Sequence, residues 1–376
     1  MVLGFLVLGL VAAALGLAAS MLVVRFGPRL LVGPGEAATE HRDERWARPA
    51  AAKSLRPAWL APGVGVLVVL AVAAAATLQR AAQAPGPPAA SAAPRRTVAL
   101  PPAALPAATS LSVLARLGGP AAGPGQLNDP RDVAVDAAGN VYVADTGNHR
   151  IVKFGPSGSF VAAWSGTAGA ALVQPVALAV VPDGLIVVDN ATGQVHKFAF
   201  NGAPVPGFEP AAGLFRPRGV AVDAAGNILV SDTGNNRLLE LAPSGAPIAS
   251  FTANGQLDQP TAVAFGPGGA VFVAEPDANA IAVLSSTGVL AAQWAMDPNS
   301  TVLPPHLLWL GSAGLLATLP AQQGLALYNP AGQVSRFWAA PAELQRPLGI
   351  APTVKGAAAW VVSNGTNEVL RIPELK

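Results

Sequence analysis

The pattern of apolar and polar positions changes near residue 110 of this chain. Before that point lie two uncharged apolar runs, at residues 1–24 and 58–79. About 20 such residues, each rising 1.5 Å along a helix, cross the hydrocarbon core of a membrane. There are two alternatives. The first run could be a secretory signal, although such a signal would carry positive residues ahead of it, and either run could be a buried helix of a soluble protein. The pattern therefore predicts transmembrane helices at 1–24 and 58–79.

The segment between the two runs, residues 25–57, is basic. Its Lys and Arg residues are Arg25, Arg29, Arg42, Arg45, Arg48, Lys53 and Arg56. Because short basic loops stay on the cytoplasmic side, we expect this loop in the cytoplasm and the rest of the chain on the extracytoplasmic side of the cytoplasmic membrane. The proline- and alanine-rich residues 80–110 are expected to form an extended linker, since proline fixes φ and removes hydrogen-bond donors.

Residues 111–376 repeat with a period of about 43 residues. The segments "PRDVAVDAAGNVYVADTGNHRIVKF" and "PRGVAVDAAGNILVSDTGNNRLLEL" match nearly residue for residue, and four looser copies make six in all. The copies begin at Pro130, Pro175, Pro217, Pro260, Pro305 and Pro347. A fixed period of this length indicates a repeat architecture, in which neighbouring units bury one another's apolar faces.

Each copy contains three short apolar runs separated by Gly-Asn turns, which predict three β-strands. A fourth run ends in an aromatic residue, and these residues recur at intervals of 43 or 44: Trp164, Phe208, Phe251, Trp294 and Trp338. Four strands per unit predict a β-propeller blade, and the aromatic residues are placed to cover the seams between sheets. The fold class is therefore all-β, a propeller of six four-stranded blades.

The sixth copy needs a fourth strand near residue 381, but the sequence ends at Lys376. An unpaired run, "SVLARLGG" at residues 112–119, precedes the first full copy. It is followed by "GPGQLNDP", which is similar to the segment "NGQLDQP" that leads into the copy at Pro260. We therefore expect this N-terminal strand to complete the last blade, which leaves no open sheet edge.

The copies resemble NHL repeats. The shared pattern is Pro-x-Gly/Asp-Val-Ala-Val-Asp, then Gly-Asn-hydrophobic-Tyr/Leu-Val-Ala/Ser-Asp, then Thr-Gly-Asn-x-Arg. The copies at Pro130 and Pro217 carry it fully, those at Pro175 and Pro260 in part, and the last two mainly by period. The resemblance covers residues 111–376 and implies a six-bladed propeller.

The chain is 52% hydrophobic, has 12% charged residues and contains no cysteine. Disulfides, thiolate metal sites and cysteine nucleophiles are therefore excluded. The formal charge is +6 over residues 1–110 and −4 over residues 111–376. Nucleic-acid binders cluster Lys and Arg to neutralise phosphates, so the charge of the repeat domain argues against a nucleic-acid partner.

The phrases "DTGNHR" and "DTGNNR" predict structural turns. In each, an aspartate ends a strand, Gly-Asn reverses the chain and an arginine starts the next strand close enough to pair with the aspartate. A reaction needs its group once, whereas a turn is needed in every blade. The residues assigned to these turns are Asp145, Arg150, Asp189, Asp232 and Arg237.

No catalytic cluster stands out in the sequence. Enzymes with NHL-like propellers include lyases acting on amidated-peptide precursors, and the resemblance implies a metal held there by several histidines near the channel. This chain has four histidines, His41, His149, His196 and His306, and only His306 falls where a channel-lining residue is expected. A zinc-type site needs three or four ligands. We therefore predict no catalytic residues, no metal and no cofactor.

The loops that join blades, and those between second and third strands, are expected to ring the ends of the channel and remain as the candidate binding surface. Their polar residues are Arg131, Asn148, His149, Arg216, Arg218, Asn235, Asn236, Gln259, Asp277 and Asn279. The sequence thus favours a membrane-tethered extracytoplasmic propeller that acts as a binding, scaffold or sensor module for a protein, peptide or glycan. The alternatives are a metal-dependent lyase or hydrolase in the channel, and an accessory module of a larger membrane enzyme such as a glycosyltransferase.

Overall fold

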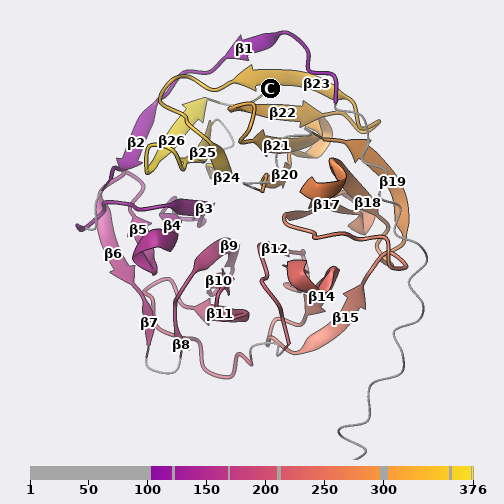
Figure 1. Ribbon diagram of the computed structural model, residues 1–376. Helices are drawn as coiled ribbons and strands as arrows, with labels where there is room; N and C mark the ends of the chain where they lie inside the picture. Colours follow the sequence, from indigo (N-terminus) through magenta and orange to yellow (C-terminus); the bar gives the residue numbers. More distant parts are fainter. Residues whose placement is uncertain are drawn as a thin grey trace, which may run out of the picture. The chain divides into compact units, whose positions relative to one another are not determined.

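The computed structural model describes residues 103–120, 123–167, 170–209, 213–296, 304–354, 358–373 and 375. These residues form six β-sheets arranged as the blades of a wheel around a central channel (Figure 1). The six-bladed all-β propeller predicted from the repeats is confirmed. The predicted segments 1–24, 25–57, 58–79 and most of 80–110 lie outside the described residues. Within the described part, the chain has no helix long and apolar enough to cross a membrane.

Blades one, three and four are four-stranded meanders in chain order. Blade one comprises β3 (Pro130–Val135), β4 (Val141–Asp145), β5 (Arg150–Phe154) and β6 (Phe160–Trp164). Blade three comprises β12 (Gly219–Val222), β13 (Ile228–Asp232), β14 (Arg237–Leu241) and β15 (Pro247–Phe251). Blade four comprises β16 (Val263–Phe265), β17 (Val271–Glu275), β18 (Ala280–Leu284) and β19 (Leu290–Ala295).

Blade two departs from the predicted four strands. It has β9 (Pro175–Val181), β10 (Gly184–Asp189) and β11 (Gln194–Phe198), and its outer edge is reduced to a bridge between Phe198 and Pro204. The sequence there, "GAPVPGF", places prolines at 204 and 206. Proline cannot donate to a ladder, so only Val205 donates to the neighbouring strand, 3.0 Å from the Lys197 carbonyl.

Blade five has one strand more than predicted. Beside β20 (Leu307–Trp309), β21 (Leu315–Leu319), β22 (Gly324–Tyr328) and β23 (Val334–Ala339) lies β1 (Ala108–Ser110), parallel to β23. The end of the segment expected to be a linker thus adds a fifth strand to this blade. Leu105, just before β1, packs against the core between blades four and five.

Blade six closes the wheel. It consists of β24 (Pro347–Pro352), β25 (Ala358–Ser363), β26 (Glu368–Pro373) and, from the other end of the propeller sequence, β2 (Ala115–Gly118). The strand β2 pairs antiparallel with β26, with Leu117 opposite Val369. The predicted closure by the N-terminal strand is confirmed, and β1 and β2 follow one another along the rim of the wheel, β1 beside β23 and β2 beside β26 (Figure 1).

Short elements complete the described secondary structure. A two-stranded sheet of β7 (Gly166–Thr167) and β8 (Ala170–Ala171) links blades one and two. Single turns of 3-10 helix, η3 (Thr146–Asn148), η4 (Thr233–Asn235) and η6 (Pro276–Ala278), join second to third strands. Two more, η5 (Pro267–Gly269) and η7 (Gly311–Ala313), join first to second strands.

The apolar core lies in the six seams between blades, and each seam has its own cluster of buried side chains. Alternate residues of one strand serve different seams. On β4, Val141 and Val143 face blade six, whereas Tyr142 and Ala144 face blade two. Because both faces are covered, the second strand of each blade reads as a continuous apolar run, and all five residues of β4 are buried.

Aromatic residues of the outer strands lie on glycines of the following blade, as expected for seam-covering side chains. A Cβ built on the glycine would come within 2.2 to 2.7 Å of the aromatic ring in three seams: Trp164 with Gly202, Phe251 with Gly288, and Trp294 with Gly332. At the closing seam a leucine takes this place, since a Cβ on Gly158 would lie 2.9 Å from Leu117 Cδ2. The glycines therefore let neighbouring blades approach each other closely.

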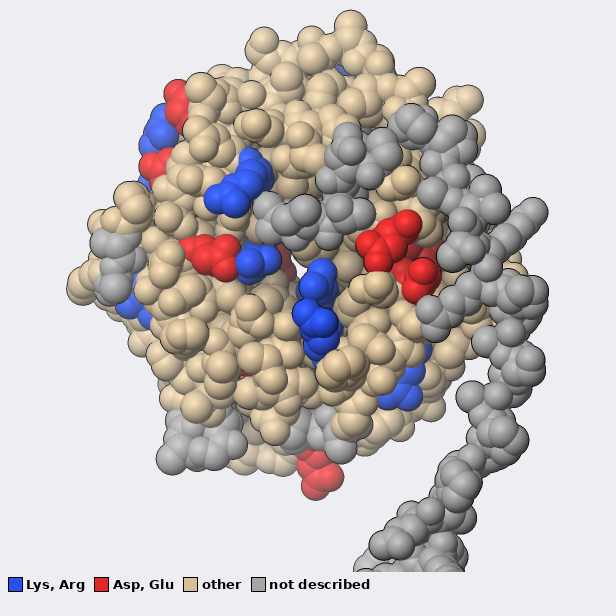
Figure 2. Space-filling model, viewed as in Figure 1, with Lys and Arg blue, Asp and Glu red and all other residues tan. Residues whose placement is uncertain are grey.

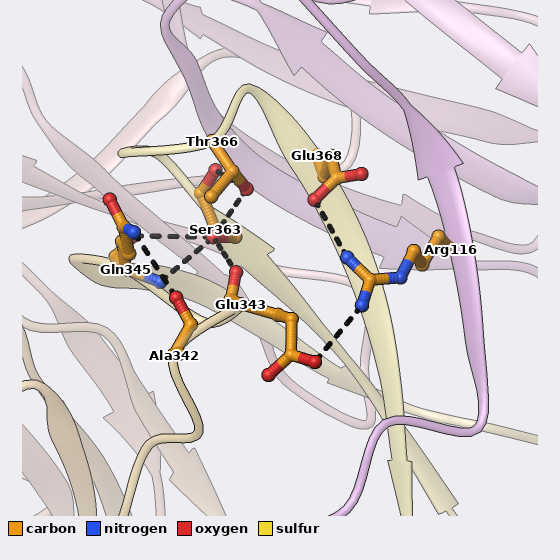
Figure 3. A network of polar contacts seen from close by, with 7 residues as sticks. All are labelled: Arg116, Ala342, Glu343, Gln345, Ser363, Thr366 and Glu368. Atoms are coloured by element: carbon orange, nitrogen blue, oxygen red, sulfur yellow. Dashed lines mark hydrogen bonds and ion pairs between the residues drawn. The ribbon is translucent and has the colours of Figure 1, made fainter.

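A polar network joins the closing strand to blade six (Figure 3). Arg116 of β2 donates to Glu368 at 3.4 Å and to Glu343 at 3.3 Å. Arg116 and Glu343 are each about half exposed, so their ion pair adds little stability, and Glu368 is more buried. Between blades six and one, Asn364 donates to the Asp129 carboxylate at 2.7 Å and to the Pro130 carbonyl at 3.0 Å.

Candidate binding site at the channel mouth

The residue that ends the second strand has the same hydrogen-bonding role in five of the six blades. Its side-chain oxygen accepts a hydrogen bond from a backbone amide of the segment that leads into the first strand. The five pairs are Asp145 with Asn128, Asp189 with Val173, Asp232 with Phe215, Glu275 with Asp258, and Ser363 with Gln345, at 2.6 to 2.9 Å. In blade five Leu319 ends the strand, and Thr318 just before it accepts from the His306 amide at 2.7 Å. These side chains hold the lead-in segments in place and build the blades.

The arginine of the turn phrase pairs with this acid where both are present. Arg150 Nε donates to Asp145 at 2.7 Å, and Arg237 Nε donates to Asp232 at 2.7 Å. Arg150 also donates to the backbone carbonyls of Gln126 and Gly123, at 2.7 and 3.1 Å. Both aspartates are fully buried, so each needs the arginine and the turn amides as partners.

The variable position of the phrase adopts the left-handed conformation. His149, Asn236, Asn279, Gln323 and Asn367 have φ between 48° and 57°. Asparagine tolerates this region better than other side chains, which accounts for its recurrence. His149 is thus one member of a set of turn residues, and its Nδ1 contacts the Val173 carbonyl of blade two.

The central channel has two chemically different ends, because all first strands run the same way from one end to the other. The mouth, where these strands begin, is a cavity of about 290 Å³ whose polar lining residues include Arg131, Asp132, Gln174, Asn190, Arg216, Arg218, Thr261 and His306. The opposite end, about 330 Å³, is lined almost entirely by apolar residues, from Val133 to Val135 in blade one and Leu307 to Trp309 in blade five. His306, Val220 and Val263 border both cavities.

Three arginines converge on the mouth. Arg131 is the second residue of β3 and forms a salt bridge with Asp129 at 2.9 Å, while Arg216 and Arg218 flank Pro217 just before β12. Burial lowers the pKa of Arg218, and the neighbouring Arg216 and Arg131 lower it further, while Asp277 acts in the opposite direction. Lys and Arg side chains (blue) lie around the central opening in Figure 2, with acidic groups (red) farther out.

Asp132 and His306 form a pair at the waist of the channel. His306 Nε2 lies 3.5 Å from Asp132 Oδ1, and the Ile350 backbone amide donates to His306 Nδ1 at 3.4 Å. Asp132 also accepts from the amides of Val133 and Leu178, both at 2.8 Å. Burial raises the pKa of Asp132, and His306 and these amides oppose that rise. With a proton on Nε2, the imidazole can face the Asp132 carboxylate and accept from the Ile350 amide through Nδ1.

The remaining histidines are separated. His196 is buried on β11, and burial lowers its pKa. His149 lies on the rim, and His41 lies outside the described residues. Within the described ranges, no three or more His, Asp or Glu side chains are grouped as a metal site requires.

The predicted rim residues separate into two groups. Arg131, Arg216 and Arg218 line the mouth cavity, and the others lie around it, with Asn236 and Gln259 lining a smaller cavity between blades three and four.

Several of those turn residues bond to their own surroundings. Asn148 and Asn235 donate to the turn aspartates of blades one and three, at 2.9 and 2.8 Å. Asn236 accepts from the Gln259 amide at 2.9 Å, and the Gln259 side chain donates to Asp277 at 2.5 Å. The side chains that sequence reasoning did not select for the mouth are Asp132, Gln174, Asn190 and Thr261. Asp132 alone had a visible signal, since the other five copies have Ala, Gly or Leu at that position.

The two most regular copies match a known repeat family. Residues 127–154 and 216–241 match the NHL repeat, and these ranges hold the first three strands of blades one and three. Protein brain tumor of Drosophila melanogaster is 38% identical over 111 residues, which is 28% of this chain and 11% of that protein. The chain thus matches about a tenth of the length of this relative.

Solved structures share the fold at low identity. Virginiamycin B lyase from Staphylococcus aureus is 14% identical, with a TM-score of 0.51 over 71% of this chain and 100% of the lyase. A chain of the mitotic checkpoint complex is 14% identical, with a TM-score of 0.50 over 74% of this chain and 97% of that chain. At such identities the likeness concerns the fold alone.

Proposed function

We propose that this six-bladed propeller with NHL repeats is a non-catalytic binding module, tethered to the cytoplasmic membrane, that holds a protein, peptide or glycan ligand at the polar mouth of its channel. The observation that carries the proposal is the contrast between the turn side chains and the mouth. The turn acids are buried and accept hydrogen bonds from backbone amides of their own blades. The side chains of Arg216 and Arg218 instead line a cavity and form no hydrogen bond or salt bridge with another side chain among the described residues.

The enzyme alternative is supported less well by the geometry. A histidine that acts as a general base needs a ring nitrogen within reach of a ligand proton. Both nitrogens of His306 already face protein groups, the Asp132 carboxylate and the Ile350 amide. The pair therefore joins blades one, five and six rather than presenting a basic nitrogen to the mouth.

Site-specific photo-crosslinking in the native cells tests the binding face. A photo-reactive residue replaces Phe215, which is 56% exposed on the rim beside the mouth, or Val354, which is 57% exposed after the first strand of blade six. Because the two positions are equally accessible but lie at opposite ends of the first strands, they form a matched pair. We expect discrete adducts from position 215 only. Adducts of equal yield from both positions, or from position 354 alone, would contradict the proposal.

The tether is tested by cysteine labelling, which the chain allows because it contains no cysteine of its own. Ser157→Cys places a thiol on the exposed surface of blade one, and Ala38→Cys places one in the basic segment 25–57. With a membrane-impermeant maleimide on intact cells, we expect labelling at position 157 only, and labelling at position 38 after lysis. Labelling of position 38 alone in intact cells would mean the opposite orientation.

A further inference from the structure

The charges at the mouth are unbalanced on one side. Within the described part of the chain, Arg116, Arg131, Arg150 and Arg237 each form a salt bridge with a carboxylate. Arg216 and Arg218 form none, although Arg218 is half-buried. The carboxylate that favours the charged form of Arg218 is the exposed Asp277, while Arg216 and Arg131 disfavour it. Half-burying a guanidinium with so little compensation is costly, and an incoming anion would lower that cost.

The surroundings of this pair suit a small anionic group on a larger ligand. Arg216 and Arg218 line both the mouth cavity and a neighbouring cavity of about 240 Å³ on the rim between blades three and four. Phe215, exposed beside them, offers an apolar face to the part of the ligand that carries the group. Two guanidinium forks present paired N–H donors, which match the oxygens of a carboxylate or phosphate.

The acidic residues of the next blade limit the length of the anion. Asp258 lines the rim cavity, and Asp277 is exposed close enough to affect the pKa of Arg218. A long polyanion crossing the mouth would meet these carboxylates, whereas a single oxyanion seated at the arginines would not. A cationic group on the same ligand would instead be attracted to Asp277.

We infer that Arg216 and Arg218 form an oxyanion site that holds a carboxylate or phosphate group of the ligand, next to Phe215. The inference rests on the proposed binding function and names the chemistry of that same mouth. The recognised group is a single terminal or side-chain oxyanion rather than a nucleic-acid backbone.

Calorimetric titration of the full-length chain in a mild nonionic detergent at low salt tests the site. The probes are hippurate for a carboxylate, phenyl phosphate for a phosphate, and hippuramide as the neutral match of hippurate. We expect saturable binding of hippurate, phenyl phosphate or both, and none of hippuramide. Since a charge-assisted hydrogen bond contributes about 1.5–3 kcal/mol, Arg218→Gln should weaken binding at least tenfold.

Two further variants keep the result interpretable. Arg336→Gln removes an exposed arginine from outer strand β23 and should change affinity less than twofold. If Arg218→Gln does not fold, the exposed Arg216→Gln replaces it with the same expectation. Binding of neither oxyanion, equal binding of hippuramide, or equal losses in the Arg218 and Arg336 variants would overturn the inference. Tighter binding of a mixed-sequence RNA oligonucleotide would overturn it in favour of a nucleic-acid partner.

Failure of this site is distinguishable from failure of the proposed function. Crosslinking from position 215 that persists in Arg218→Gln, together with no oxyanion binding, would leave the binding module intact and remove the oxyanion site. Oxyanion binding without any crosslinked partner would support the oxyanion site and contradict the proposed binding of a partner at this face.

Discussion

Trp164 of blade one lies directly over Gly202 of blade two, so that a Cβ on this glycine would approach the indole Cδ2 to 2.7 Å. Gly202→Ala should therefore lower the free energy of unfolding by about 2–4 kcal/mol, from overpacking of the seam plus the cost of a positive φ. Gly207→Ala is the control, because Gly207 has a similar φ of +74° but open space around it. Urea unfolding should show a clearly smaller loss for the control; equal losses would mean that the seam contact contributes nothing.

The closing strand should depend on Leu117. This side chain is 3% exposed in the seam between blades six and one, whereas Leu114 is 54% exposed just before the strand. Leu117→Ala should cost about 2–4 kcal/mol, while Leu114→Ala should stay within about 0.5 kcal/mol. Thermal unfolding of both variants checks this, and a Leu117 variant as stable as the wild type would mean that β2 does not hold the wheel closed.

Blade six should reject the acid that blades one and three require. Ser363 donates to the Glu343 carbonyl at 2.9 Å and accepts from the Gln345 amide at 2.9 Å (Figure 3). The third strand of this blade begins with Glu368, where blades one and three have arginine. Ser363→Asp should therefore destabilise the fold by about 1–3 kcal/mol, because a buried carboxylate would face another acid.

A matched variant separates charge from lost hydrogen bonding. Ser363→Asn has nearly the size of aspartate but no charge, and Ser286→Ala on an exposed turn measures the background. We expect the aspartate variant to be the least stable at pH 8 and to recover relative to asparagine near pH 4. A Ser363→Asp protein more stable than the wild type would contradict the charge argument.

Stability should fall as pH rises towards neutrality because of Glu275. Burial raises the pKa of this carboxyl to about 7, and the Asp258 amide opposes the rise. The folded protein thus keeps a proton that the unfolded chain, with an ordinary pKa of 4.5, has released. Stability due to this group is present below about pH 4.5 and is lost as pH rises through 7.

Glu275→Gln should remove this pH dependence. At pH 8 it should raise the free energy of unfolding, measured with urea, by about 1–3 kcal/mol over the wild type. The exposed Glu209→Gln is the control and should follow the wild-type pH profile. Parallel profiles for Glu275→Gln and the wild type would show that Glu275 titrates normally.

His149 should be replaceable by asparagine without loss of stability. Its φ of 56° matches that of Asn236 in the sister turn, so the histidine is not required by the backbone. His149→Asn should lie within about 0.5 kcal/mol of the wild type, whereas His149→Val should lose about 1–2 kcal/mol because a β-branched residue resists positive φ. Chemical unfolding checks both, and a large loss with asparagine would point to a further role for the imidazole.

The repeat period and the missing tail strand were sufficient to predict six blades and their closure, because both depend on positions counted along the chain. The arginines at the mouth could also be placed, since Pro217 fixes where the first strand of blade three begins. Pro204 and Pro206 indicate that blade two lacks a regular fourth strand. The regular spacing of the aromatic residues, with Phe208 at the expected position, nevertheless favoured a fourth strand there.

Other features depend on contacts between segments that lie far apart in the sequence. Asp132 lies against Gly349, where a Cβ would come within 2.3 Å of its carboxylate, and these residues meet only when the wheel closes. The strand β1 has the sequence Ala-Thr-Ser, which carries no apolar alternation, and it forms only because β23 offers an edge.

The placement of β1 determines how a mechanical force applied to the preceding residues would be transmitted to the propeller. Its three residues are exposed and pair with only one neighbour, whereas the four residues of β2 include a leucine buried in a seam. Under load β1 should peel from blade five before β2 is strained, so the outer strand would act as a release that lengthens the chain and spares the ring.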